Sequence, residues 1–240
     1  MTGFQAGGLA ADLAALEATG KPIRIGLIGS GMMGTDIVTQ VLQMRGIVVA
    51  AIADINVPAA VAALAEAGHA ADAHRVVESA SALEQAIRDK RIAITPDADL
   101  VCTCALIDVV VDATGKPAVG AQIGLAAMEH GKHLVMMNVE ADVTIGAYLK
   151  HEADRLGVVY SLGAGDEPSA TIELINFVSA LGYPVIAAGK GKNNPLNVDA
   201  TPDDYAAQAR EMGLNPRMLV EFVDGSKTAV EMSAIANATG

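Results

Sequence analysis

Short apolar segments alternate with longer alanine-rich segments across residues 22–162, and this alternation limits the fold more than any other feature. The short segments are apolar throughout, as in "GIVVAAIAD" and "IDVVVDAT", rather than apolar at every second position. Strands of this kind suit a parallel sheet that helices cover on both faces. Because the strand–helix unit recurs along the chain, we predict an α/β fold with a doubly wound parallel sheet.

The same pattern gives approximate boundaries. We expect strands at residues 22–29, 46–54, 107–114, 132–138 and 158–162, and helices at 32–44, 57–68, 117–131 and 146–157, with a less distinct unit over 74–104. Beyond it we expect helices at 166–182, 201–213 and 226–240, and a strand that starts at residue 183 and runs into a polar loop. The predicted organisation is an N-terminal helix (1–20), a dinucleotide-binding Rossmann domain (21–145) and a catalytic or substrate region (146–240).

Composition excludes several classes of function. The 240 residues carry a net charge of −12, which argues against binding to nucleic acid or to an anionic membrane surface. No apolar run approaches the roughly 20 residues of a membrane span. The N-terminus lacks the basic start and apolar core of a signal peptide. We therefore expect a soluble cytoplasmic protein, in which Cys102 and Cys104 are small core residues.

A glycine cluster follows the first predicted strand. The sequence "GSGMMG" is G-x-G-x-x-G, with a strand before it, a helix after it and an aspartate 20 residues further on. That setting is typical of dinucleotide binding, in which glycines permit a tight turn and a pyrophosphate meets the N-terminus of the helix. The predicted cofactor contacts here are Gly29, Ser30, Gly31, Met32, Met33 and Gly34.

Asp54 ends the second predicted strand and is a candidate acceptor for an adenosine ribose, which favours NAD. No arginine follows in "ADINVPA" to hold a 2′-phosphate. Asp112, Thr114 and Gly115 end a later strand, where ligands of open α/β sheets bind, and are further cofactor candidates. Each of these residues is also an ordinary choice for a strand-end turn.

Two polar stretches are candidates for the chemistry. The first is "NVEAD", with Asn138, Glu140 and Asp142, and the second is "GAGDEP" followed by "GKGKNN", with Asp166, Glu167, Lys190, Lys192, Asn193 and Asn194. Carboxylates are the oxygen ligands that Mg²⁺ and Mn²⁺ prefer. Ammonium groups bind phosphate or stabilise a developing oxyanion. The alternatives are a solvated basic turn for the lysines and favourable helix N-terminal acids for Asp166 and Glu167.

Several longer motifs resemble one family: "GLIGSGMMGTDIV", "VVVDATGKP", "GKHLVMMNVEADVTIG", "GAGDEP" and "AAGKGKNNPLN". Together they are similar to the homoserine-dehydrogenase-like oxidoreductases that carry a C-terminal SAF domain. This family includes the DRL proteins, which convert 1-deoxy-D-xylulose 5-phosphate to 2-C-methyl-D-erythritol 4-phosphate with NADPH and a divalent metal. Members continue beyond the residues equivalent to "ANATG", so we expect this chain to match the N-terminal part of the family and to contain part of its α/β catalytic domain.

The resemblance implies roles for individual residues. Glu140, Asp166 and Glu167 would hold or organise Mg²⁺ or Mn²⁺, Lys190 and Lys192 would bind phosphate or oxyanion charge, and Asn138 would contact the cofactor. Glu167 is also a candidate catalytic group. The implied cofactor is NADP, with NAD as the alternative that Asp54 favours. True homoserine dehydrogenases carry lysine after the asparagine equivalent to Asn138, whereas this chain has Val139, which argues against plain homoserine oxidation.

The sequence therefore leads to three hypotheses about function. The first is a DRL-type reductoisomerase of isoprenoid precursor synthesis, and the second is a homoserine-dehydrogenase-like oxidoreductase. The third is a dinucleotide-binding regulatory domain without catalysis, since a Rossmann-type sheet alone does not determine function. We expect a small phosphorylated or polar substrate, no nucleic acid or membrane partner, and a homo-oligomer.

Overall fold

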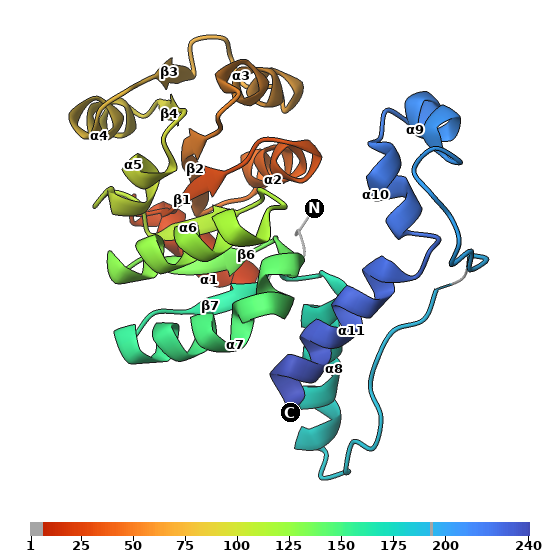
Figure 1. Ribbon diagram of the computed structural model, residues 1–240. Helices are drawn as coiled ribbons and strands as arrows, with labels where there is room; N and C mark the ends of the chain where they lie inside the picture. The colour runs from red at the N-terminus through yellow and green to blue at the C-terminus, as the bar shows by residue number, and fades with distance from the viewer. Residues whose placement is uncertain (1–6, 193) are drawn as a thin grey trace, which may run out of the picture. The chain divides into compact units, whose positions relative to one another are not determined.

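The computed structural model describes residues 7–192 and 194–240 (Figure 1). The chain separates into two compact units. The sheet unit contains residues up to 141 together with 148–161, and the helical unit contains residues 142–147 together with 162–240.

One seven-stranded sheet has the order β3-β4-β2-β1-β5-β6-β7. Its strands are β1 Ile23–Ile28, β2 Ile47–Ala53, β3 His74–Val76, β4 Ile92–Thr95, β5 Val109–Asp112, β6 His133–Met136 and β7 Tyr160–Leu162. The β1–β2, β1–β5, β2–β4, β3–β4 and β5–β6 pairs are all parallel. The predicted doubly wound parallel sheet is confirmed.

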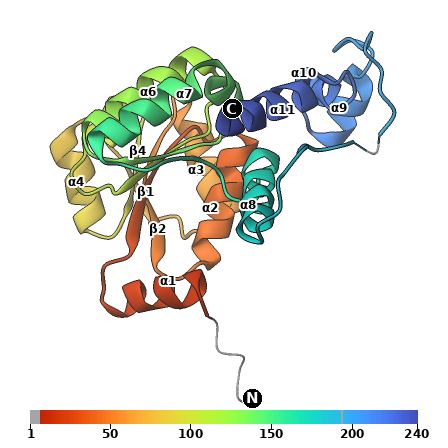
Figure 2. The ribbon, with the colours of Figure 1, turned by 90° about the horizontal axis from the view of Figure 1, so that it is seen from below.

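Helices cover both faces of this sheet. They are α1 Leu9–Ala18, α2 Met32–Gln43, α3 Val57–Glu66, α4 Ala80–Arg88, α5 Ala98–Thr103, α6 Pro117–Glu129 and α7 Val139–Leu156. Figure 2 shows α2 and α3 on one face of the sheet, and α4, α6 and α7 on the other. Two-sided cover explains why the central strands are apolar at most positions rather than at alternate ones. Helix α7 begins seven residues before the predicted start at 146, because the Asn138 side chain caps it.

The core of the sheet unit lies where the central strands meet α2 and α3. Leu27, Val38, Ile52, Leu64 and Ile94 are fully buried there and belong to one apolar cluster. Burying such a side chain stabilises the fold by about 1.5–3 kcal/mol. These aliphatic contacts hold the central strands in register and thereby fix the loops at their carboxyl ends.

The direction of winding reverses at β1. From β1 the chain passes to β2 on one side, and β5 pairs with β1 on the other. The loops that follow β1 and β5 therefore leave the sheet side by side: the Ala113 amide donates to the Ile28 carbonyl at 2.8 Å. In open α/β sheets, ligands bind at such a reversal, beyond the carboxyl ends of the strands.

The helical unit contains four further helices, α8 Glu167–Ala180, α9 Ala206–Met212, α10 Pro216–Glu221 and α11 Ser226–Thr239. Helices α8 and α11 pack against each other, as do α9 and α10 (Figure 1). Asn237 Nδ2 donates to the Val143 carbonyl at 3.2 Å, which joins α11 to residues 142–147 of the same unit.

The strand predicted from residue 183 is wrong for residues 183–192, which form neither strand nor helix. Ile186 in this segment is 95% exposed. A strand exists only where a neighbouring backbone accepts and donates its hydrogen bonds, and no described segment pairs with this one. The helix predicted at 201–213 forms only from Ala206, and helix α10 was not predicted.

No helix among the described residues has the length and apolar character that crossing a membrane requires.

Both cysteines are buried, which confirms their prediction as core residues. Burial is the largest cause that raises the pKa of Cys102, to about 12, and the nearby carboxylate of Asp99 is the next. Burial also raises the pKa of Cys104. Since the thiolate is the reactive form of cysteine, both side chains are inert in the folded chain.

We predict that neither thiol reacts with Ellman's reagent at pH 8 in the native protein. At that pH a thiol with a pKa near 12 has a thiolate fraction roughly three orders of magnitude below that of a free cysteine. Both thiols should react at once in 6 M guanidinium chloride. Rapid labelling of Cys102 without denaturant would contradict its burial.

Candidate functional site

The loop between β1 and α2 is held by close contacts between backbone segments. Gly29 has a φ of +94°, and a Cβ at this position would lie 2.8 Å from the Ala113 carbonyl oxygen. A Cβ on Gly34 would lie 2.2 Å from the Gly29 carbonyl oxygen. Position 29 therefore requires glycine so that the loop after β1 can pass beside the loop after β5. Position 34 requires glycine so that the first turn of α2 can pack against the Gly29 carbonyl.

The N-terminus of α2 is open to a ligand. Gly31 is the N-cap and supplies no side-chain hydrogen bond, and nothing described lies within 4 Å of where its Cβ would be. Met32 and Met33, in the first turn, are 47% and 43% exposed. Their N–H groups lack helical partners and lie at the positive end of the helix dipole. This open backbone fits a pyrophosphate.

Asp54 follows β2 and ties this loop in place. Its Oδ2 accepts hydrogen bonds from the Ser30 amide at 2.7 Å and from the Ser30 hydroxyl at 2.5 Å. Its Oδ1 accepts from the Asn56 amide at 2.8 Å. Ser30 is buried. The Asp54 carboxylate thus connects the end of β2 to the glycine-rich loop.

A second polar cluster joins the ends of β5 and β6. Asp112 is fully buried; its Oδ1 accepts from the Thr114 amide at 2.9 Å and its Oδ2 from Asn138 Nδ2 at 3.2 Å. Asn138 Nδ2 also donates to the Lys116 carbonyl at 2.9 Å, and its Oδ1 accepts from the Ala141 amide at 3.2 Å. Asn138 therefore caps α7 and links β6 to the turn that begins α6.

Gly115 and Gly120 complete the turn after β5. Gly115 has a φ of +63°, a conformation that favours glycine. A Cβ on Gly120, in α6, would lie 2.5 Å from Asp112 Oδ2 and 2.7 Å from Asn138 Nδ2. The small residue lets α6 approach the buried polar cluster closely.

The helical unit holds a cluster of charges around Lys190. Lys190 Nζ contacts Glu167 Oε1 at 2.6 Å and also donates to Glu231 Oε2. Glu231, on α11, is 1% exposed, and its other oxygen lies 3.8 Å from Lys227 Nζ. The backbone of this segment is anchored too, because the Lys190 amide lies 3.4 Å from Met232 Sδ.

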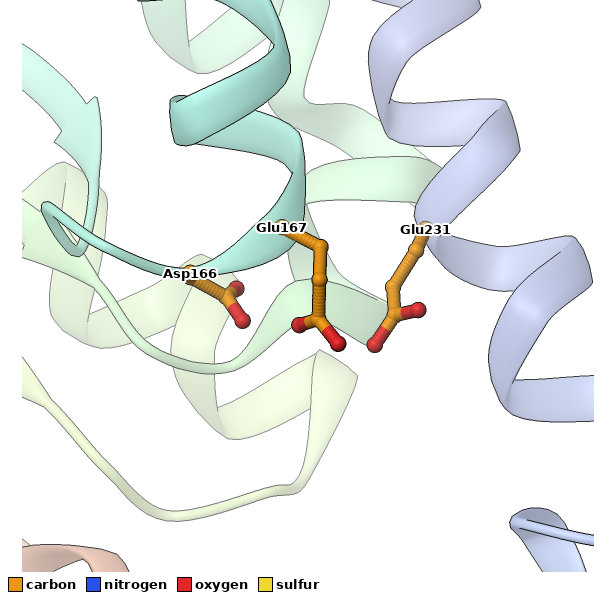
Figure 3. A group of neighbouring side chains, drawn as sticks. All are labelled: Asp166, Glu167 and Glu231. Atoms are coloured by element: carbon orange, nitrogen blue, oxygen red, sulfur yellow. The ribbon is translucent and has the colours of Figure 1, made fainter. Parts of the chain in front are cut away.

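Three carboxylates of this unit face one another: Asp166, Glu167 and Glu231 (Figure 3). One oxygen of each lies within 4.8 Å of the others. Asp166 is the N-cap residue of α8, and its Oδ2 is buried without a hydrogen-bond partner among the described residues. Figure 3 shows Asp166 and Glu167 at the start of α8 and Glu231 reaching toward them from α11.

Electrostatics differ sharply between neighbouring carboxyls. The Lys190 hydrogen bond lowers the pKa of Glu167 to about 2. Burial, followed by the adjacent Glu167 carboxylate, raises the pKa of Asp166. Burial alone lowers the pKa of Lys190, but its bonds to Glu167 and Glu231 outweigh this and raise it above the usual value. Lys190 is therefore a fixed positive charge at neutral pH.

Comparison with known families fits this arrangement. Residues 29–160, more than half of the chain, match the family model of the homoserine dehydrogenase NAD-binding domain. The chain belongs to this family. Residues 165–240 match the model of the catalytic domain of oxidoreductase DRL. Together the two matches cover residues 29–160 and 165–240, and the NAD-binding match covers most of the sheet unit. Among curated proteins, none matches the sequence.

Solved structures give weaker likenesses. A homoserine dehydrogenase from Thiobacillus denitrificans has 21% identity over 67% of this chain and 34% of its own, with a TM-score of 0.49. An NAD binding oxidoreductase from Klebsiella pneumoniae has 19% identity over 67% and 39%, with a TM-score of 0.47. A myo-inositol dehydrogenase from Lactobacillus casei, in complex with NAD(H) and myo-inositol, has 21% identity over 65% and 42%, with a TM-score of 0.45. The chain thus spans less than half of the length of these proteins, and the family assignment rests on the two family models alone.

The predicted cofactor residues gather at the carboxyl ends of β1, β2, β5 and β6. They are Gly29, Ser30, Gly31, Met32, Met33, Gly34, Asp54, Asp112, Thr114, Gly115 and Asn138. Their contacts with a dinucleotide stay predictions. Asp112 and Asn138 also have a structural role, because their hydrogen bonds hold together the loops that follow β5 and β6.

The residues predicted to act in catalysis or metal binding do not all lie together in the structure. Asp166, Glu167 and Lys190 come together, whereas Lys192 Nζ lies 4.7 Å from the centre of the Phe222 ring and Asn194 Nδ2 donates to the Phe222 carbonyl at 2.9 Å. Glu140 lies in the first turn of α7 within the sheet unit, so its part in a metal site stays a prediction. Asn193 lies outside the described residues.

Sequence reasoning missed Glu231, although a signal was present. Glu231 is flanked by apolar residues in "TAVEMSAIA", in a helix whose other buried positions, Ala234 and Ile235, are apolar. It also stands four residues after Lys227, the spacing at which opposite charges meet on a helix. Its main partner, Lys190, is 41 residues away in sequence, so the pair could not be read from local spacing.

The cluster of Asp166, Glu167 and Glu231 has the oxygen donors that a divalent cation requires. Each of the three carboxylates offers one oxygen within 4.8 Å of the others, and hard cations such as Mg²⁺ prefer oxygen ligands. Asp166 also has one buried oxygen, Oδ2, without a hydrogen-bond partner among the described residues. The ammonium of Lys190 offsets only one of the two negative charges of Glu167 and Glu231, so a cation bound by all three carboxylates would add to or replace it. The residues that would hold it are Asp166, Glu167 and Glu231.

We predict that Lys190→Met destabilises the helical unit by roughly 3–5 kcal/mol, because it leaves a buried carboxylate without its main partner. The double variant Lys190→Met/Glu231→Leu should recover most of that loss, since the buried charge is gone as well. Urea unfolding followed by circular dichroism measures both. Lys192→Met, which removes an exposed lysine from the same segment, is the matched control and should change stability by at most about 1 kcal/mol. Equal losses in the single and double variants would contradict the ion pair.

We predict that Asp166→Asn stabilises the metal-free protein at neutral pH, measured as the urea midpoint in EDTA. The folded-state pKa of Asp166 is raised above the ordinary 3.8. Below that pH the carboxyl is protonated in both states, so this effect vanishes. Between 3.8 and the raised folded-state pKa, the unfolded carboxyl loses its proton before the folded one, so the wild type loses stability as the pH rises and the advantage of the variant appears; that advantage is complete above the folded-state pKa. Asp199→Asn, at an exposed aspartate of the same unit, should show no such pH-dependent gain.

Proposed function

We propose that this chain provides the cofactor-binding domain and part of the catalytic domain of a DRL-type reductoisomerase. The reaction is the NADPH-dependent conversion of 1-deoxy-D-xylulose 5-phosphate to 2-C-methyl-D-erythritol 4-phosphate, a step of isoprenoid precursor synthesis. The observation that carries the proposal is the cluster of Asp166, Glu167, Lys190 and Glu231, which lies wholly within the stretch that matches the DRL catalytic domain. The glycine-rich loop of the sheet unit supplies the complementary cofactor site.

The residues of the cluster suit a ketose phosphate. When bound, NADPH supplies a hydride and a divalent cation polarises the carbonyl and hydroxyl oxygens of the substrate. Asp166, Glu167 and Glu231 supply the negative charge that retains such a cation. Once a cation takes over Glu167 and Glu231, the ammonium of Lys190 would be released to meet a phosphate or oxyanion charge that develops on the substrate. Burial of Glu231 limits the water that competes with these contacts.

A homoserine-dehydrogenase-like oxidoreductase is the second candidate, because the longer match is to the NAD-binding domain of that enzyme. Val139 argues against it. Homoserine dehydrogenases place a lysine at this position, directly after the asparagine that here caps α7. A valine cannot hold a carboxylate or move a proton, so this position contributes nothing to alcohol oxidation.

We predict metal-dependent consumption of NADPH with 1-deoxy-D-xylulose 5-phosphate, followed as absorbance at 340 nm with and without Mn²⁺. Asp166→Asn should abolish the response to Mn²⁺ while NADPH binding persists, because the variant removes one metal ligand and leaves the glycine-rich loop intact. A loss of roughly 100-fold or more in turnover is expected for a carboxylate that organises a metal. Asp199→Asn is the matched control and should keep full turnover.

Other outcomes decide between the alternatives. Oxidation of homoserine with NAD(P)⁺, in place of ketose phosphate turnover, would overturn the proposal in favour of the second candidate. Tight binding of NADPH with no turnover of either substrate would favour a dinucleotide-binding domain without catalysis. Equal turnover by Asp166→Asn and the wild type would remove the carboxylate cluster from the reaction.

A further inference from the structure

Ser30 and Asp54 form an interaction that dinucleotide binding alone does not explain. Both the main-chain N–H and the side-chain O–H of Ser30 donate to one carboxylate oxygen, Asp54 Oδ2, at 2.7 and 2.5 Å. The other oxygen, Oδ1, accepts from the Asn56 amide at 2.8 Å. Three donors of the chain therefore occupy the aspartate that ends β2, the residue placed to meet an adenosine ribose.

The number of acceptor positions on the Asp54 carboxylate limits how many ribose hydroxyls it can bind. An ionised carboxylate offers about four lone-pair positions. With three used internally, about one is left for a ligand. The adenosine ribose of NADH presents two adjacent hydroxyls, at 2′ and 3′, whereas that of NADPH presents only the 3′-hydroxyl because the 2′ position is phosphorylated. The folded chain therefore has room for the single hydroxyl of NADPH but lacks a position for the second hydroxyl of NADH.

The three internal donors differ in how much of the backbone must move to release them. The Asn56 amide is fixed because the Asn56 side chain caps α3 through the Ala59 amide. The Ser30 amide belongs to the loop backbone, which Thr35 also holds through its hydrogen bond to the Gly31 carbonyl at 2.9 Å. The Ser30 hydroxyl, in contrast, turns about a single bond. It is the donor that must leave if both ribose hydroxyls are to reach Asp54.

We propose that Ser30 is a specificity-determining residue of the cofactor site. Its hydroxyl competes with the ribose diol for Asp54 and so lowers the affinity for NADH relative to NADPH. The inference rests on the proposed function only in requiring that the glycine-rich loop binds a nicotinamide dinucleotide.

The sequence around Asp54 offers no other charged residue that could set the preference between NADH and NADPH. Asp54 is the only charged residue between positions 47 and 65, so no arginine or lysine of that stretch is available to hold a 2′-phosphate. A free aspartate at this place disfavours the 2′-phosphate and accepts both hydroxyls of NADH. Three internal hydrogen bonds disperse the charge of Asp54 and reduce its acceptor capacity. They therefore weaken both its repulsion of a 2′-phosphate and its attraction for the two ribose hydroxyls of NADH.

The test compares NADH and NADPH dissociation constants, from nicotinamide fluorescence titration, for the wild type, Ser30→Ala and Ser30→Thr. Ser30→Ala keeps the main-chain hydrogen bond to Asp54 and removes only the competing hydroxyl. It should tighten NADH by roughly three- to tenfold, the range expected for one released hydrogen bond, and should leave NADPH unchanged or weaker. Ser30→Thr keeps a hydroxyl and should retain the wild-type ratio.

Amide hydrogen exchange of the ligand-free protein supplies a second readout. Protection of the Ser30 amide equal to that of the wild type in Ser30→Ala, together with the shifted ratio, supports the proposal. Loss of both affinities by the same factor would show that the hydroxyl only stabilises the loop, and an unchanged ratio would show that it does not compete; either result overturns the inference. Failure of the wild type to bind NADH or NADPH would instead overturn the proposed function on which the inference rests.

Discussion

Close contact between the backbones of two loops, those after β1 and β5, is the constraint on which the cofactor side of this structure depends. Gly29 passes beside Ala113, and Gly34 starts α2 against the Gly29 carbonyl, with no room for a Cβ at either position. Because β1 pairs with both β2 and β5, the loops after these strands converge at one edge of the sheet. The open N–H groups of α2 are available to a pyrophosphate only because side chains are absent from this contact.

Hydrogen bonds and ion pairs determine the conformations of the loop ends, which the apolar core does not specify. Aliphatic packing sets the spacing of strands and helices, but it leaves the loop ends free to choose among conformations. In the sheet unit, Asp112 and Asn138 tie the β5 and β6 ends together through directed hydrogen bonds. In the helical unit, the ion pair of Lys190 with Glu231 ties the segment after α8 to α11. Both arrangements bury charge or amide groups, and each is stable only while all its partners are present.

The features that the sequence predicted are those with local causes. The strands were predicted because each is apolar over its own few residues, and the glycine-rich loop because its spacing, flanking strand and following helix are contiguous. The strand at residue 183 failed for the opposite reason: its composition favours a strand, but strand formation depends on a neighbour elsewhere in the chain. Glu231 was missed likewise, since its main partner, Lys190, comes from a segment far away in sequence.

Asp54 shows why a sequence motif does not by itself determine the preference between NAD and NADP. Its position after β2 indicates a ribose acceptor, and taken alone it favours NAD. In the folded chain the same carboxylate accepts from Ser30 and Asn56, so its capacity toward a ligand depends on residues that the motif leaves unspecified. The proposal for Ser30 reconciles an NAD-type aspartate with an NADPH-type resemblance, because it places the preference in the hydrogen-bond network rather than in one residue. Under that proposal, a neighbouring hydroxyl that binds the aspartate shifts the choice of cofactor without a change in the glycine pattern.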